Sequence, residues 1–236
     1  MLFQNNATGA VAHDAGLAAH MRLIFNYMTG GVALSGLVAW LTLKSPEALQ
    51  FAMQAHLILF LVWFGMGMFF HKIAFNTQPT TALAMFALYS GLTGFMLAPI
   101  ALVYTGADIT LAFFAAAGSF LAASLYGYTT GKSLAGLGSF LAVGSIALLI
   151  FAVVLIGWSI FGTVPQGLSL VFSALVVPFI VIAIAFKMNQ IRETYHTYGH
   201  NELQSSRLAI FNALGFYTDF VVLFIHILNI IGASRR

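Results

Sequence analysis

The sequence predicts an all-α fold, a polytopic membrane bundle of seven transmembrane helices without a water-soluble domain. Of the 236 residues, 61% are hydrophobic and only 6% are charged, whereas soluble domains carry about 25% charged residues. The mean hydropathy is +0.96, and apolar runs of about 20 residues, the length that crosses a bilayer, recur along the chain. So few charged residues could not cover this apolar surface in water. The sequence therefore predicts that the helices are surrounded by lipid.

Charged and turn-forming residues bracket each of these runs. The first run begins after Arg22 and ends before Lys44, and the third follows a polar loop at 76–79. The loop at 105–108 before the fourth run is very short, and Asp108 is its candidate helix cap. The predicted spans are 23–43, 53–70, 82–104, 109–128, 137–158, 168–186 and 208–231. Small residues are dense in the third to fifth spans, which favours close helix packing in lipid.

Two stretches fall outside the predicted spans. Residues 1–20 are weakly polar and lack the pattern of a cleavable signal peptide. They are predicted to form a short tail before a single transmembrane domain over 21–236. Residues 187–207 form the only long polar stretch and are expected to be a solvated cytoplasmic connector. A surface helix that continues the sixth span is the alternative for this connector.

The distribution of lysine and arginine predicts the orientation, because cytoplasmic loops of membrane proteins are enriched in both. With the N-terminus inside, the inner side carries Arg22, Lys72, Lys132, Lys187, Arg192 and Arg207. The outer side then carries only Lys44, Arg235 and Arg236. The N-terminus is therefore expected in the cytoplasm. Seven spans put the C-terminus outside, whereas six spans would put it inside.

Several function classes are excluded by what the sequence lacks. It has no cysteine, which removes disulfides and thiolate chemistry, and its few cations do not cluster into a nucleic-acid patch. No serine or threonine with a base beside it, phosphate loop or dinucleotide fingerprint indicates an enzyme. His56 and His226 are both expected near the outer interface, where two histidines could bind haem or a metal. Because ordinary interfacial contacts explain both histidines equally well, neither a cofactor nor a metal is predicted.

The most informative residue is Asp219, an acid inside the seventh span. It lies about eleven residues into that span, roughly 16 Å deep at 1.5 Å per residue. A carboxylate at this depth must be neutralised or paired. It is interpreted as a proton-sensing or ion-binding site, with a structurally hydrogen-bonded acid as the alternative. Lys187 closes the sixth span and is the candidate partner, unless its ammonium reaches the interface instead.

Three sequence elements together are similar to a known family. The run at 124–134 reads SLYGYTTGKSL, the run at 88–94 reads LYSGLTG, and the run at 213–224 contains Asp219 and Phe220. The central motif residues are Tyr126, Gly127, Tyr128, Thr129 and Thr130. These elements resemble the signatures of the Bax inhibitor one family, in its bacterial, YccA-like branch. The resemblance covers about residues 20–233.

This resemblance implies a seven-helix protein of the bacterial inner membrane whose last helix is central. It implies one of two functions, which stay open here. The first is a pH-sensitive channel that leaks calcium or another cation. The second is a non-channel regulator that binds a membrane protease such as FtsH, or another partner in membrane stress. The implied partners are therefore the lipid bilayer, a cation and a membrane protease.

One departure from the family pattern concerns the acid site. The family's sixth span ends in AYDTQxIK, whose aspartate shares a proton with the aspartate of the seventh span, because two close carboxylates cannot both ionise. Here residues 185–192 read AFKMNQIR, so Lys187 takes the aspartate's position while Asp219 is retained. We therefore expect a salt bridge that holds Asp219 ionised, with the acid-pair gate absent or shifted. One carboxylate beside a lysine also suits calcium poorly, since calcium prefers several oxygen ligands.

Overall fold

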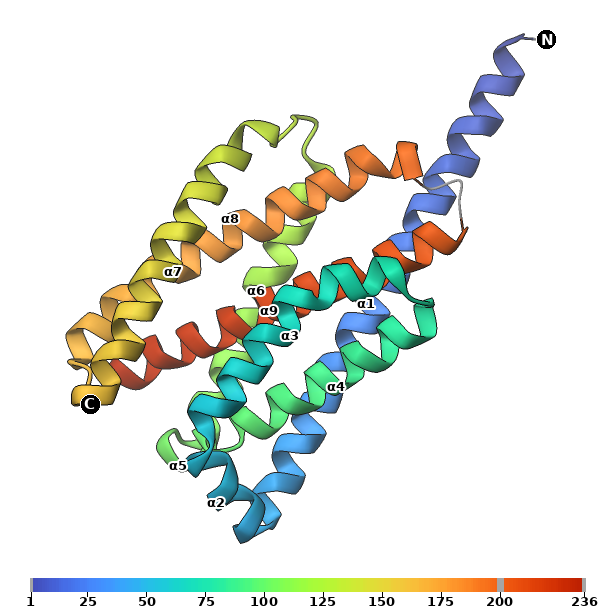
Figure 1. The fold of residues 1–236 in the computed structure, drawn as a ribbon. Coiled ribbons are helices and arrows are strands. Elements are labelled where there is room, and N and C mark those ends of the chain that lie inside the picture. The colour runs from blue at the N-terminus through green and yellow to red at the C-terminus, as the bar shows by residue number, and fades with distance from the viewer. Residues whose placement is uncertain (1, 199–201, 235–236) are drawn as a thin grey trace. The chain divides into compact units, whose positions relative to one another are not determined.

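The computed structural model describes residues 2–198 and 202–234, and every regular element in them is a helix (Figure 1). In the first half of the chain the helices are α1 (Leu2–Lys44), α2 (Pro46–Gln54), α3 (His56–Asn76), α4 (Pro79–Leu97) and α5 (Ile100–Val103). In the second half they are α6 (Gly106–Thr129), the 3-10 turn η1 (Ala135–Leu137), α7 (Gly138–Phe161), α8 (Gln166–Tyr198) and α9 (Glu202–Ser234). The predicted all-α class is confirmed.

The chain divides into two compact units by its internal contacts. Unit 1 comprises Met1–Val103 with Tyr195–Tyr217, and unit 2 comprises Tyr104–Thr194 with Thr218–Arg236. The boundaries therefore fall within α8 and α9, each of which contributes to both units. The single transmembrane domain over 21–236 stays a prediction.

Six helices of the described chain are long and apolar enough to cross a membrane, and a seventh span is formed if α2 and α3 are counted together. These two helices meet at Ala55 with a bend of 76°. Pro46 begins α2, and Ser45 caps it by accepting a hydrogen bond from the Ala48 amide at 3.3 Å. The predicted second span at 53–70 thus crosses this bend, with Met53 and Gln54 in α2 and residues from His56 onward in α3.

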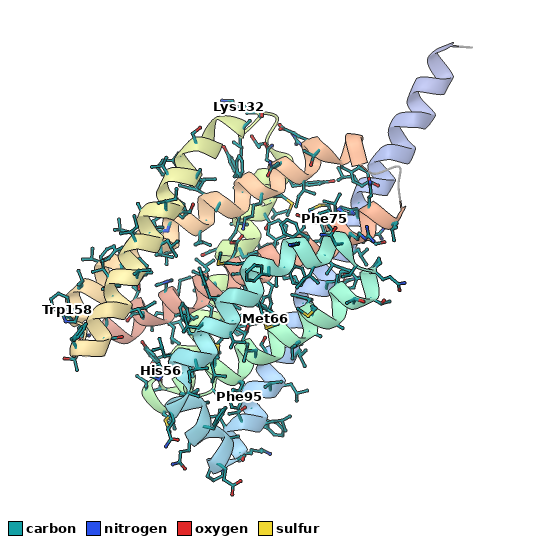
Figure 2. The ribbon with its side chains drawn as sticks, viewed as in Figure 1. His56, Met66, Phe75, Phe95, Lys132 and Trp158 are labelled. Atoms are coloured by element: carbon teal, nitrogen blue, oxygen red, sulfur yellow. The ribbon has the colours of Figure 1, made fainter. Side chains whose placement is uncertain are left out.

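Unit 1 is built on the contacts that α4 makes with α1 and with α3 (Figure 1). At Gly94 a Cβ atom would lie 2.7 Å from the Ser35 Cα, so the two helix backbones touch there. Trp63 of α3 donates a 2.8 Å hydrogen bond to the Thr93 hydroxyl of α4. Figure 2 labels Phe95, whose ring packs against Phe51 of α2. Small residues thus allow the close packing expected from the sequence.

Unit 2 contains α6, α7, most of α8 and the end of α9. Helices α7 and α8 lie side by side (Figure 1), and Phe179 of α8 packs over Gly144 of α7. A Cβ at Gly127 of α6 would lie 2.9 Å from the Ala185 Cα of α8, so these two backbones also touch. Thr105 caps α6 by accepting from the Asp108 amide at 3.2 Å. The cap is therefore the threonine, not Asp108 as predicted, and its hydroxyl donates to that carboxylate at 2.6 Å.

The polar connector predicted at 187–207 is helical wherever the structure describes it. Helix α8 continues to Tyr198, and α9 begins at Glu202. Met188 and Asn189 are at most 2% exposed. The solvated-loop prediction is wrong, because α8 continues the sixth span without a break to Tyr198. The alternative of a continuing helix is confirmed, but its buried Met188 and Asn189 show that it is not a surface helix.

The predicted tail at 1–20 also differs in the structure, where α1 extends back to Leu2 without a break. Leu17 and His20 are buried. The His20 Nδ1 lies 3.0 Å from the Ser205 hydroxyl of α9. The end of this stretch therefore packs within unit 1.

The last helix is the most buried of the six candidate spans. In α9, 56% of the most apolar window is buried, against 6% to 33% in the other five. This burial confirms the prediction that the last helix is central.

Candidate functional site

The candidate site lies where α8 and α9 bring two opposite charges together inside unit 2. The Lys187 ammonium donates hydrogen bonds of 2.9 and 2.8 Å to the two carboxylate oxygens of Asp219. The Asp219 side chain is only 8% exposed, whereas the Lys187 side chain is 41% exposed. The ion pair thus has one deeply buried partner and one that reaches the surface of the fold.

Aromatic residues pack directly beside Asp219 in the chain. The next residue, Phe220, makes edge-on contacts with Phe113 and Phe120 of α6, at ring-centroid distances of 5.5 and 6.2 Å. Aromatic rings exclude water but cannot neutralise a carboxylate. The described structure therefore leaves the Lys187 ammonium as the group that compensates the buried acid.

The signature motif lies at the end of α6 and in the turn that follows it. Tyr126, Gly127, Tyr128 and Thr129 end α6, and Thr130 is its C-terminal cap. The Tyr126 side chain is exposed, and the Thr129 hydroxyl donates to the Leu125 carbonyl one turn earlier. In the described part of the chain, no hydrogen bond of this motif reaches the ion pair directly. Figure 2 labels Lys132 in the turn between α6 and α7.

Helix α8 holds this turn through side chains that sequence reasoning missed. The Asn189 amide oxygen accepts from the Leu134 backbone amide at 2.9 Å, and its amide nitrogen donates to the carbonyls of Gly127 and Lys132 at 3.4 and 3.3 Å. The Arg192 guanidinium donates to the carbonyl of Tyr128 at 2.7 Å. These partners are main-chain atoms, so no pairing of side-chain types in the sequence pointed to them.

A second polar cluster lies along α8 and α9, toward the far end of unit 2. The His226 Nδ1 is 2.9 Å from the Ser173 hydroxyl. The Asn229 amide donates to the hydroxyls of Ser169 and Ser173 at 2.7 and 2.8 Å. Polar groups that bond across helices in this way stabilise packing in lipid.

Each of the two histidines considered as ligands has a hydrogen-bond partner within the fold. His56 bonds the carbonyl of Met53 in α2 at 3.0 Å, and His226 bonds α8 as described. No group of three or more histidine, cysteine or acidic side chains suited to a metal occurs among the described residues.

Tyr217, two residues before Asp219, belongs to a buried network in unit 1. Its hydroxyl is 2.6 Å from that of Ser35, which donates to the carbonyls of Gly31 and Ser90. Its ring packs edge-on against Phe86 of α4. The hydroxyls are separated by 182 positions in the chain, which is why the sequence alone could not pair them.

Comparison with known proteins gives the family. The family model described as inhibitor of apoptosis-promoting Bax1 matches residues 17–236. The chain belongs to the Bax inhibitor-1 family. Similar relatives include an uncharacterized protein of Rickettsia prowazekii, 31% identical over 226 residues, which cover 94% of this chain and 92% of the relative. Inner membrane protein YbhL of Escherichia coli is 30% identical over 227 residues, with 94% of each chain covered.

Membership of the Bax inhibitor-1 family confirms the resemblance found in the sequence. An uncharacterized protein of Caulobacter vibrioides, 31% identical over 236 residues, extends the same likeness over 94% of this chain. Together with the apolar helices, the family makes this chain a multi-pass membrane protein. In this Bax inhibitor-1 family member, the Lys187–Asp219 pair joins α8 to α9.

Proposed function

We propose that this chain is a non-enzymatic protein of the bacterial inner membrane that forms a cation-leak pathway, held closed by the Lys187–Asp219 ion pair. The observation that carries the proposal is the bidentate contact of the Lys187 ammonium with both oxygens of the buried Asp219 carboxylate. A carboxylate in a membrane helix is costly and marks a functional position more often than a packing one. The inner-membrane placement is supported by the similarity to inner membrane protein YbhL of Escherichia coli.

The ion pair gives this pathway a different gate from a pair of acids. Two carboxylates sharing a proton separate when the proton leaves, because like charges repel. A lysine and an aspartate attract each other in their charged forms, so loss of that shared proton no longer drives opening. Lys187 also places a positive charge beside the only acid of the site, and this charge repels calcium. The site then offers calcium a single carboxylate, although calcium prefers several oxygen ligands. We therefore expect weak calcium flux that changes little with pH.

The orientation is part of the same proposal. The N-terminus lies in the cytoplasm, because Lys and Arg are more numerous on the side that this orientation makes inner. Lys187 then lies in the cytoplasmic half of α8, before the end of the Gln166–Tyr195 span, and its side chain is 41% exposed. Opening would therefore start from the cytoplasmic side of the ion pair.

The test is calcium flux into liposomes that contain the purified protein, measured from acidic to mildly alkaline pH. The wild type is compared with Lys187→Asp, which restores two acids, and with Lys187→Met, which removes the charge. Lys132→Met is the matched control, because Lys132 is exposed in the turn after α6. We expect Lys187→Asp to gain strongly pH-dependent flux, with the control unchanged.

Two results would contradict the proposal. Strong acid-pair-like gating in the wild type would show that Lys187 does not replace the gate. Absence of flux in all variants, together with copurification of a membrane protease that is lost on deleting residues 1–20, would favour the regulator.

A further inference from the structure

Helix α8 presents two opposite faces near Lys187, and each face has its own partner. Ala185 and Asn189 are four residues apart and share one face, which meets Gly127 of α6. At 100° per residue, Lys187 lies about 200° from each of them, on the reverse face that meets Asp219. Rotation or sliding of α8 on α6 would therefore carry the lysine away from the acid.

The α6 face of α8 is fixed by groups that allow little adjustment. A Cβ at Gly127 would lie 2.9 Å from the Ala185 Cα, so the backbones are already in contact. Asn189, 1% exposed, adds three hydrogen bonds to main-chain atoms of residues 127–134. A buried amide that loses such partners is strongly penalised, so α8 has one favoured register here.

We propose that Asn189 is a positioning residue for the ion pair. It holds the turn after α6 to one face of α8 and thereby directs Lys187, on the other face, to Asp219. Only the effect on gating rests on the proposed function: if the ion pair closes the pathway, the position of Asn189 also sets whether the gate is open or closed. The geometry itself can be tested without any transport measurement.

The test measures how fast a small acylating reagent modifies Lys187 in the detergent-solubilised protein, by peptide mass spectrometry. Lys187 is reachable because its side chain is 41% exposed, and exposed Lys72 serves as the internal reference. An ion-paired amine reacts more slowly, so Asp219→Asn is expected to raise the Lys187 rate about three- to tenfold.

Asn189→Leu keeps the volume of the side chain but removes all its hydrogen bonds. We expect this variant to raise the Lys187 rate by a similar factor. It should add nothing in the Asp219→Asn background, because the pair through which Asn189 acts is then already broken. Asn229→Leu is the matched control. It removes a partly buried amide that also bonds several oxygen atoms of α8, and it should leave the rate unchanged.

A second perturbation leaves α8 intact and keeps the test decisive if Asn189→Leu folds poorly. One glycine inserted after Gly131 displaces two of the three main-chain partners of Asn189, the Lys132 carbonyl and the Leu134 amide, and it should raise the Lys187 rate in the same way. An unchanged rate in both variants, or an equal rise with and without Asp219, overturns the proposal. If the rates behave as expected while the flux of Lys187→Asp stays at the wild-type level, the positioning stands and the proposed function fails.

Discussion

Replacing Gly127 by alanine tests the contact between α6 and α8 on which the ion pair depends. The added Cβ would lie 2.9 Å from both the Cα and the carbonyl carbon of Ala185. Carbon atoms in contact are ordinarily about 3.5–4.0 Å apart, so these two contacts alone require the backbones to separate by at least about 0.6 Å. The Ala185 carbonyl oxygen lies closer still to the added Cβ. Overpacking of this kind costs about 1–3 kcal/mol.

Gly118, on the same helix, supplies the matched control. It is exposed, and a Cβ there would meet nothing within 4 Å. Both substitutions gain the same helix propensity, up to about 1 kcal/mol, so this term cancels between them. Gly127→Ala should therefore be less stable than Gly118→Ala by about 1–3 kcal/mol, the packing term alone.

The assay is thermal unfolding of both variants in the same detergent, followed by circular dichroism. For a chain of this size, 1 kcal/mol corresponds to about 2–4 °C in Tm, so Gly127→Ala should unfold about 2–12 °C below Gly118→Ala. Equal melting temperatures, or a more stable Gly127→Ala, would refute the close contact of α6 and α8 and with it the fixed register of Lys187.

Three further substitutions probe the buried polar groups and backbone contacts by the same unfolding assay. Tyr217→Phe removes the 2.6 Å hydrogen bond to Ser35 and should cost about 1 kcal/mol; no loss would mean that the bond contributes nothing. Gly94→Ala places a Cβ 2.7 Å from the Ser35 Cα and should cost about 1–3 kcal/mol, and a stabilised variant would contradict the contact of α1 with α4. Asn229→Leu leaves Ser173 without its amide donor and should cost about 1–2 kcal/mol, whereas unchanged stability would show that this cluster is dispensable.

The membrane spans could be predicted from the sequence, because a helix that crosses lipid must be a long apolar run. The break at Ala55 could not be predicted, since the sequence there contains neither proline nor glycine. The stretch after Lys187 was misread as solvated for a related reason. Its polar residues look like a surface loop until the partners of Asn189 are known, and those partners are main-chain atoms with no sequence signature.

The ion pair itself could be predicted because a charge within an apolar helix must find compensation. Asp219 and Lys187 are the charges that the sequence places in, or at the end of, adjoining spans. The distances, and the unequal exposure of the two side chains, needed the structure. The bond between Tyr217 and Ser35 was out of reach for sequence reasoning, because many hydroxyls in the early spans could have served as well.

The hold of Asn189 on the turn after α6 bears on how that turn can change in evolution or by design. An amide that bonds peptide groups does not distinguish one side chain from another, so Gly131 and Lys132 can be exchanged without losing this anchor. Ser133 differs, because its hydroxyl also donates to the Glu193 carboxylate of α8 at 3.2 Å. The spacing of the gripped groups is what matters, from the carbonyl of Gly127 to the amide of Leu134. A loop library built on this protein should therefore vary residues 131 and 132 freely, retain Thr130 and Ser133, and keep the length constant.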